Sequence, residues 1–165
     1  MKKEMNSSGA YLTFGVHKEE FASSIAFVKE IIEMPDVTKI PQSPAYMKGI
    51  INLRGNVLPV VDLSVRFGLP TSKDTYKTRV IVFELRNNEN KILIGGVVDY
   101  TDDVVQIEEE ALLPPPALED EQKVTYIENI VSKDDKFIMI VDVEKVFDKE
   151  ELKKLDAITL ATATA

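Results

Sequence analysis

The chain has 165 residues, 44% of them hydrophobic, which is enough for one globular domain with a substantial core. Its 28 acidic and 20 basic residues give a net charge of −8, which disfavours binding to nucleic acid or to an anionic membrane, since both depend on clustered Lys and Arg. It has no cysteine, and no apolar stretch is long enough for a signal peptide or a membrane span. We therefore expect a cytoplasmic protein without disulfides.

The composition predicts a mainly β protein. Val and Ile together number 33 against 13 Leu, and β-branched side chains favour strands over helices. In chain order, apolar runs between turn residues predict strands at 11–16, 31–34, 49–53, 57–61, 78–85, 91–99, 126–131 and 137–141. Segments rich in Asn, Asp or Gly predict hairpin turns at 55–56, 86–90 and 133–136.

Helices are predicted to be few and short. Residues 27–31 are expected to form one turn. Asp62 and Asp142 each follow a strand and are suited to cap short helices at 63–67 and 143–147. A terminal turn is predicted at 150–155, and the closing residues 161–165 have no interpretable pattern.

An internal similarity suggests two related halves. Residues 58–67 recur 80 positions later as 138–147, with Val-Asp and the final Phe in register. This pattern predicts two consecutive small β units, each ending in a capped helical turn, joined by a connector at 68–74. Such units are typical of five-stranded barrels, in which the sheet curls to remove its edges. Chance recurrence of a strand followed by a capped helix is the alternative.

Catalysis is not expected. His17 is the one histidine, and neither a nucleophile motif nor a metal-binding histidine pair accompanies it. The acidic runs at 102–103 and 108–110 lack the alternating ligands and the turn glycine of a calcium loop, and the seven glycines form no phosphate-binding loop. We predict no enzyme activity, no metal and no cofactor.

One hairpin carries a specific motif. Residues 49–55 are Gly-Ile-Ile-Asn-Leu-Arg-Gly and residues 58–63 are Leu-Pro-Val-Val-Asp-Leu. These two pieces resemble the core motif of the CheW family, the adaptors that join chemoreceptors to the chemotaxis histidine kinase. The resemblance continues upstream through 28–32 and 37–41, and downstream through 95–99 to 138–145. It covers about residues 10–150.

The resemblance implies a single domain over residues 10–150, made of two packed five-stranded barrels of the Src-homology-3-like kind with short helices. Subdomain 1 would span about 10–70 and subdomain 2 about 75–150, with flexible tails at 1–9 and 157–165. It also implies a non-catalytic scaffold in receptor arrays at the inner face of the membrane. That scaffold would bind the tips of methyl-accepting chemoreceptors in a groove between the barrels and the regulatory domain of the kinase CheA on a barrel face.

Transferred position by position, the family's receptor-facing surface falls on Val28, Glu30, Asn52, Arg54, Val98 and Val104. Arg54 is the strongest candidate, because a guanidinium offers five donors to carbonyls or carboxylates of a receptor helix. The alternative for Arg54 is an internal ion pair with Glu30. For Val28 and Val98 the alternative is an ordinary place in the core.

The family's kinase-contacting edge falls on Val37, Ile40, Pro41, Pro44 and Tyr46. The two prolines remove backbone donors and stiffen this edge, which lowers the cost of ordering it in a complex. Ile40 and Tyr46 are predicted to be exposed apolar anchors. The alternative for Tyr46 is that it packs beneath the loop.

Some residues depart from the family pattern. Ser23-Ser24 stands where alternating apolar residues are usual, Phe27 where a polar residue is common, and Pro114-Pro115-Pro116 predicts an extended crossing loop. Three other functions stay open. The first is a CheW-like domain of the kinase or of a receiver-bearing adaptor, although the length leaves no room for a further module. The second is a small-ligand-binding β-barrel, and the third is an enzyme that depends on His17.

Overall fold

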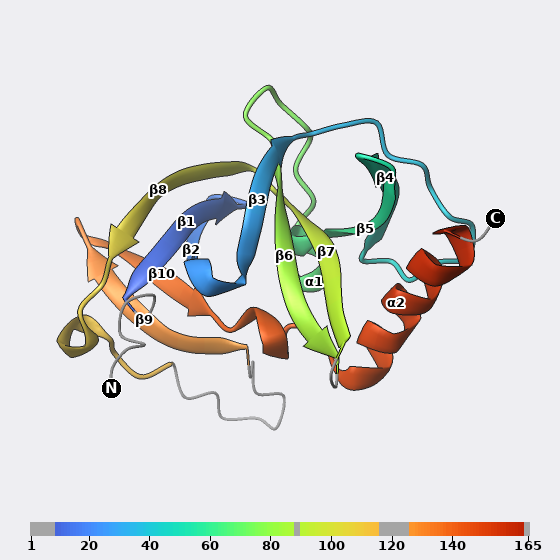
Figure 1. Cartoon of the computed structure of the whole chain (residues 1–165). Helices are drawn as coiled ribbons and strands as arrows, with labels where there is room; N and C mark the ends of the chain where they lie inside the picture. The colour runs from blue at the N-terminus through green and yellow to red at the C-terminus, as the bar shows by residue number, and fades with distance from the viewer. Residues whose placement is uncertain (1–8, 88–89, 116–125, 164–165) are drawn as a thin grey trace.

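Two five-stranded sheets make up the protein (Figure 1). The computed structural model describes residues 9–87, 90–115 and 126–163, and within them the chain forms ten strands, two α-helices and three 3₁₀ helices. The prediction of a mainly β protein is confirmed. No helix in these described residues is both long enough and apolar enough to cross a membrane.

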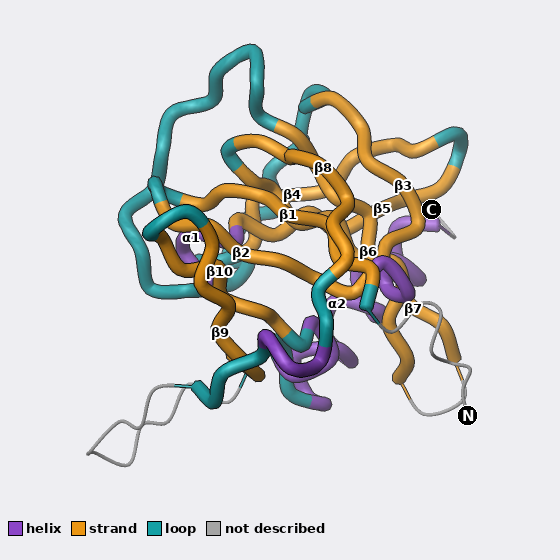
Figure 2. The backbone as a smooth tube through the Cα atoms, turned by 90° about the vertical axis from the view of Figure 1, so that its left-hand side faces the viewer, coloured by secondary structure: helices purple, strands orange, loops and turns teal. Residues whose placement is uncertain are grey.

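The first sheet takes strands from both ends of the chain. Its order is β8-β1-β2-β10-β9, and Figure 2 shows these strands following one another in this order. Their bounds are Ala10–Val16 for β1, Glu19–Ser24 for β2, Tyr100–Gln106 for β8, Ile127–Lys133 for β9 and Lys136–Val141 for β10. β10 runs parallel to β2, and the other neighbours are antiparallel.

The second sheet is continuous in sequence. Its order is β3-β6-β7-β5-β4, with β5 parallel to β7. The bounds are Val28–Glu33 for β3, Met47–Leu53 for β4, Asn56–Asp62 for β5, Arg79–Asn87 for β6 and Asn90–Val98 for β7. The 3₁₀ helix η1, Ile25–Phe27, leads from the first sheet into the second.

The two sheets have the same topology, and this corrects the prediction of two consecutive subdomains at 10–70 and 75–150. In each sheet order β3 corresponds to β8, β4 to β9 and β5 to β10, while β6 and β7 correspond to β1 and β2. The similarity at an offset of 80 residues is therefore genuine. However, the unit that contains β8, β9 and β10 is completed by β1 and β2 from the N-terminus of the chain. The sheets are interleaved in sequence rather than successive.

Each sheet is bridged at its edges by a loop. Thr38, after edge strand β3, pairs with Ile50 of the opposite edge strand β4, and Leu113, after β8, pairs with Ile130 of β9. In the strand pairings of the described residues the two edge strands of a sheet are not partners, so each sheet is open rather than a closed barrel. Single bridges therefore cover the edges that a barrel would remove.

Both predicted capped turns are present. Asp62 precedes helix α1, Leu63–Arg66, and accepts a hydrogen bond from the Ser64 N–H at 3.0 Å. Asp142 precedes the 3₁₀ helix η3, Val143–Lys145, and accepts one from the Glu144 N–H at 3.1 Å. Such caps satisfy N–H groups that the helix itself cannot.

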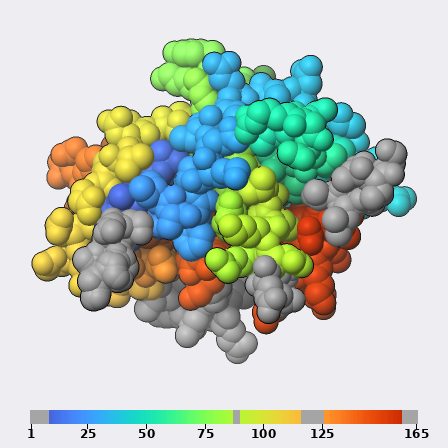
Figure 3. Space-filling view, in the orientation of Figure 1, coloured from blue at the N-terminus to red at the C-terminus, as the bar shows by residue number. Residues whose placement is uncertain are grey.

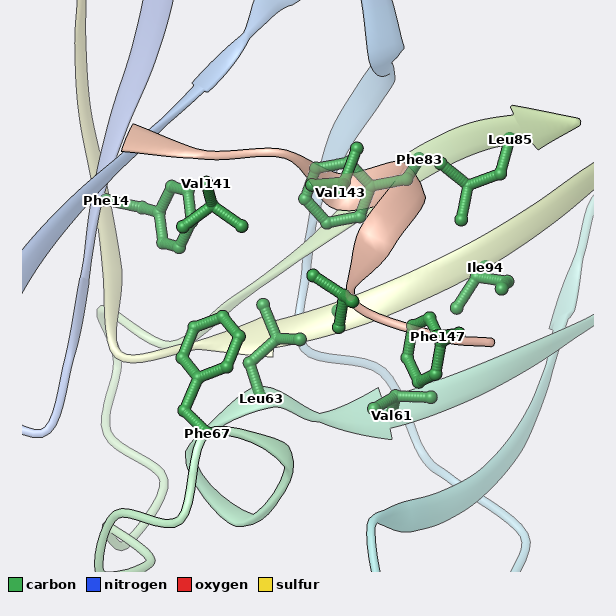
Figure 4. A pocket seen from close by; sticks show the side chains of 12 residues that line it. Phe14, Val61, Leu63, Phe67, Phe83, Leu85, Ile94, Val141, Val143 and Phe147 are labelled. Carbon is green, nitrogen blue, oxygen red and sulfur yellow. The ribbon is translucent and has the colours of Figure 1, made fainter. Parts of the chain in front are cut away.

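The main core lies between the sheets. Its buried side chains come from both, including Phe14 of β1, Phe83 of β6 and Phe147 after η3. Figure 4 shows them around a small apolar cavity of about 10 Å³. That is barely room for one water, and the apolar lining gives a water no partner. This cavity does not favour the small-ligand alternative.

Several element predictions are corrected. The sequence did not predict β2 or β8, and residues 28–31 belong to strand β3 instead of a helical turn. Helix α2 runs over Lys149–Ala163, so most of the tail expected at 157–165 is helical, and it packs beside β5 (Figure 1). Outside the described residues lie residues 1–8 of the predicted N-terminal tail, residues 88–89 of the predicted turn at 86–90, Pro116 of the predicted crossing loop and residues 164–165 of the predicted C-terminal tail.

Candidate partner-binding surface

Glu30 and Arg54 meet at the edge of the second sheet. Glu30 lies on edge strand β3, and Arg54 lies in the turn between β4 and β5; Arg54 Nη2 donates a hydrogen bond to Glu30 Oε2 within an ion pair. The Arg54 side chain stays 65% exposed and that of Glu30 25%. The hydrogen bond and charge of Glu30 raise the pKa of Arg54 above its usual value. The internal ion pair considered for Arg54 is therefore confirmed.

The turn that carries Arg54 requires an unusual backbone conformation. Arg54 has φ +52° and Gly55 φ +89°, the two positive angles of a two-residue type I′ turn, so the turn is 54–55 rather than the predicted 55–56. Asn, Asp and Gly tolerate this conformation better than Arg does. The Asn52 side chain accepts a hydrogen bond from the Gly55 N–H at 2.8 Å and so closes the turn.

Most of the other predicted receptor residues lie on edge strands. Val28 begins β3 and is half-buried, and Val104 of edge strand β8 is 56% exposed. Asn52 near the end of β4 is exposed. In Figure 3 the yellow surface of β8, the blue surface around β3 and the teal surface of β4 and β5 all face the viewer. The elements that carry these residues thus share one face.

Val98 is the exception. Its side chain is only 1% exposed, at the end of β7 in the main core. The core alternative holds for Val98, and it offers no side-chain surface to a partner.

The loop after β3 carries the predicted kinase edge. Thr38 exchanges two backbone hydrogen bonds with Ile50, at 2.9 and 2.8 Å. This approach needs Gly49, which has φ +151°, because a Cβ there would lie 2.2 Å from the Thr38 carbonyl oxygen. The loop is thereby tied to β4.

The tip of this loop is a tight turn. Pro41 is followed by Gln42 with φ +63°, and the Ser43 N–H donates to the Ile40 carbonyl at 3.3 Å, the pattern of a type II turn. Pro41 is exposed, whereas Val37, Ile40, Pro44 and Tyr46 are half-buried. Ile40 and Tyr46, predicted to be exposed anchors, are only partly exposed because both pack against the main core, and their contact with a kinase stays a prediction.

Tyr46 lies in a cluster that the sequence did not predict. Its ring contacts the Phe147 ring at 5.7 Å between centroids, and the Arg66 guanidinium lies over both rings, 5.4 and 5.2 Å from their centroids. Arg66 Nε also donates to the Val146 carbonyl at 2.8 Å, and Arg66 Nη2 lies 3.0 Å from Glu151 Oε1. Burial raises the pKa of Tyr46, and the charge of Glu151 adds to this effect while Arg66 opposes it.

The internal similarity contained a signal for this cluster. Tyr46 and Phe67 correspond to Tyr126 and Phe147 at the offset of 80 residues. The structure pairs them crosswise, Tyr46 with Phe147 and Tyr126 with Phe67 at 5.2 Å. The Asp62 N–H donates to the Tyr46 carbonyl and the Asp142 N–H to the Tyr126 carbonyl, at 2.7 and 2.8 Å. The two units therefore meet around an approximate two-fold relation.

The receptor candidate Arg54 and the kinase candidate Tyr46 lie at opposite ends of one strand, while Val37 of the kinase edge lies beside the Thr38–Ile50 bridge in its middle. β4 begins directly after Tyr46 and ends directly before Arg54. Seven residues of extended strand span about 20 Å. A partner at the Arg54 turn and another at the loop before β4 would thus contact different parts of the molecule.

Comparisons with known proteins agree on one family. A family model described as a CheW-like domain matches residues 10–151. The chain is 33% identical over 150 residues to the chemotaxis protein CheW of Bacillus subtilis, covering 91% of this chain and 94% of that protein. A probable chemotaxis protein CheW of Rhizobium etli is 31% identical over 140 residues, covering 85% and 88%.

A solved structure is also similar. The scaffolding protein TtCheW from Thermoanaerobacter tengcongensis superposes with a TM-score of 0.75 at 30% sequence identity, covering 87% of this chain and 96% of that one.

Proposed function

The chain belongs to the CheW family, and from this premise we propose that it is a chemotaxis adaptor that couples chemoreceptors to a CheA-type histidine kinase. Its relatives are chemotaxis proteins, and a similar solved structure is a scaffolding protein. Together they support an adaptor role in chemotaxis. We assign it no catalytic step and no cofactor, and we place it in the cytoplasm beside receptor arrays.

The observation that carries the receptor half of this proposal is the conformation of Arg54. The residue holds a left-handed turn position that Asn or Gly would occupy with less strain, and it presents a largely exposed guanidinium. An Arg at this strained position supports a binding role for its side chain, because a less strained residue there would make the fold more stable. Glu30 fixes the direction of that guanidinium.

In this proposal the receptor tip contacts Arg54, Glu30 and Asn52, flanked by Val28 and Val104. The guanidinium can donate to carbonyl or carboxylate oxygens of a receptor helix, and the two valines supply apolar contact at the edges of the sheets. Val98 supports this face only from within the core.

The kinase regulatory domain is assigned to the loop with Val37, Ile40, Pro41, Pro44 and Tyr46. The Thr38–Ile50 bridge and the Pro41 turn hold this loop in one conformation, which lowers the entropy cost of docking. Because both surfaces adjoin β4, the adaptor fixes the kinase relative to the receptor. A receptor movement can then change kinase activity through their relative placement.

Titration calorimetry with two partners tests the proposal. The wild type, Arg54→Ala and Pro41→Asp are each titrated with a receptor cytoplasmic fragment and with the regulatory domain of a CheA-type kinase. We expect the wild type to bind both, Arg54→Ala to lose affinity for the receptor alone, and Pro41→Asp to lose affinity for the kinase alone. If neither partner binds the wild type, the proposal is wrong.

A further inference from the structure

Arg66 joins four parts of the chain that are distant in sequence. It ends helix α1, bonds the Val146 carbonyl after η3, pairs with Glu151 of α2 and lies over the ring of Tyr46 at the end of the loop. Its side chain is 26% exposed and that of Glu151 20%. Partial burial of an ion pair reduces its screening by solvent. These contacts are therefore suited to hold the four segments in one arrangement.

Glu151 anchors this arrangement to helix α2. The Asp148 N–H donates to Glu151 Oε1 at 2.9 Å, and the Glu151 N–H donates to Asp148 Oδ1 at 2.8 Å. This reciprocal pair is a capping box at the start of α2. Arg66 binds the same carboxylate oxygen, so the guanidinium is attached to the first turn of a helix whose Leu152 and Leu155 are buried in the core.

Tyr46 depends on this anchor for its orientation. Its ring lies against Phe147 and beneath the guanidinium, contacts that favour one ring position through stacking and cation–π attraction. Its carbonyl accepts a hydrogen bond from the Asp62 N–H, and the Met47 N–H beside it donates to the Pro44 carbonyl at 2.9 Å. The end of the loop is thus fixed from its backbone and from its side chain.

We propose that Arg66 is a positioning residue for the kinase-facing loop, which it sets by holding the Tyr46 ring against Phe147 while it binds Glu151 at the start of helix α2. Arg66 belongs to neither predicted surface, yet it connects the loop to the segment after η3 through Val146 and to α2 through Glu151. The inference rests on the proposed function, because it assigns the loop to the kinase. It adds that the geometry of the loop is controlled from the junction between the two units.

Three variants and one control test this role. Arg66→Ala removes all the contacts, and Arg66→Lys keeps the charge but loses the planar fork that reaches a carbonyl and a carboxylate together. Glu151→Gln weakens the ion pair while Gln still fits a capping box. Arg79→Ala is the matched control, because Arg79 also donates to backbone carbonyls, those of Tyr76 and Thr78 at 2.9 Å, away from Tyr46.

Two readouts are combined. Titration calorimetry gives the affinity for the kinase regulatory domain and for the receptor fragment, and NMR gives the nuclear Overhauser effect between the ring protons of Tyr46 and Phe147. For Arg66→Ala we expect about a tenfold loss of kinase affinity, unchanged receptor affinity and a weaker ring-to-ring effect. Arg66→Lys and Glu151→Gln should fall in between, and Arg79→Ala should match the wild type.

Two results overturn the inference alone. The first is that Arg66→Ala binds the kinase domain as tightly as the wild type does. The second is that Arg66→Ala loses affinity for the kinase domain and for the receptor fragment equally. If Arg66→Ala fails to fold, Glu151→Gln decides in the same way, by its kinase affinity and its ring-to-ring effect. A wild type that binds no kinase domain would overturn the proposed function, and this inference with it.

Discussion

Arg54 combines an exposed guanidinium with a backbone angle that favours other residues. At φ +52° Asn is more stable than Ala, so Arg54→Asn should unfold at a higher urea midpoint than Arg54→Ala. Both variants should lose receptor affinity, because neither carries the guanidinium. Urea titrations followed by circular dichroism measure the first effect and calorimetry the second. A large fall in midpoint with receptor affinity intact would mean that Arg54 serves the fold instead.

For single residues, the sequence predicted which side chains interact better than it predicted how exposed they are. It identified Arg54 and its alternative partner Glu30, because a lone Arg at the tip of an apolar hairpin is conspicuous. It misjudged the exposure of Ile40 and Tyr46, which pack against the main core, and the ring partner of Tyr46, Phe147, lies about 100 residues further along the chain. Arg66 was missed for the same reason: its partners Val146 and Glu151 are 80 and 85 residues away.

The bridge between Thr38 and β4 depends on Gly49. Gly49→Ala places a methyl group 2.2 Å from the Thr38 carbonyl oxygen, so we expect a loss of about 1–3 kcal/mol in unfolding free energy. Gly55→Ala is the control, because it also has positive φ but meets nothing within 4 Å. Urea denaturation should show the larger loss for Gly49→Ala. An equal loss in both variants would mean that the strained backbone angle, and not the close contact with Thr38, causes the destabilisation.

The two capped turns allow a paired comparison. Asp62 accepts hydrogen bonds from both the Ser64 N–H and the Ser64 hydroxyl, and Ser64 is buried, whereas Asp142 caps through the Glu144 N–H. We expect Asp62→Ala to cost about 2 kcal/mol and Asp142→Ala about 1. Thermal unfolding of the two variants checks this order. The reverse order would show that the second cap is the more important one.

Element prediction succeeded where apolar runs and caps were strong, and failed at polar strands. β8 contains Asp102 and Asp103 and is an edge strand, so its pattern resembles a loop. β2 contains Glu19, Glu20 and two serines, yet Ser23 is fully buried between neighbouring strands. Both strands are specified by their partners in the sheet rather than by their own composition.

The two units share one core, and this determines how the whole molecule unfolds. Phe14 and Val141 of the first sheet lie in the same buried cluster as Val61 and Phe83 of the second. We therefore expect a single cooperative transition, with coincident urea curves from circular dichroism and from NMR signals of β1 and β6. Two separated transitions would mean that the sheets are independent domains.

The overall architecture was only half predictable. The repeat of 80 residues revealed two similar units, but a repeat in sequence does not indicate which strands complete each unit. The chain enters the first sheet with β1 and β2, completes the second, and returns with β8. The long-range pairings of β10 with β2 and of β8 with β1 show that the first sheet draws on both ends of the chain.

In the proposed function one molecule holds a receptor and a kinase at the same time, with Arg54 and Tyr46 at the two ends of β4. The decisive measurement is sedimentation velocity of the protein mixed with a receptor cytoplasmic fragment and a kinase regulatory domain. We expect a single species with the combined mass of all three, and Arg54→Ala should lose only the receptor from it. Displacement of one partner by the other would show instead that the two binding surfaces overlap.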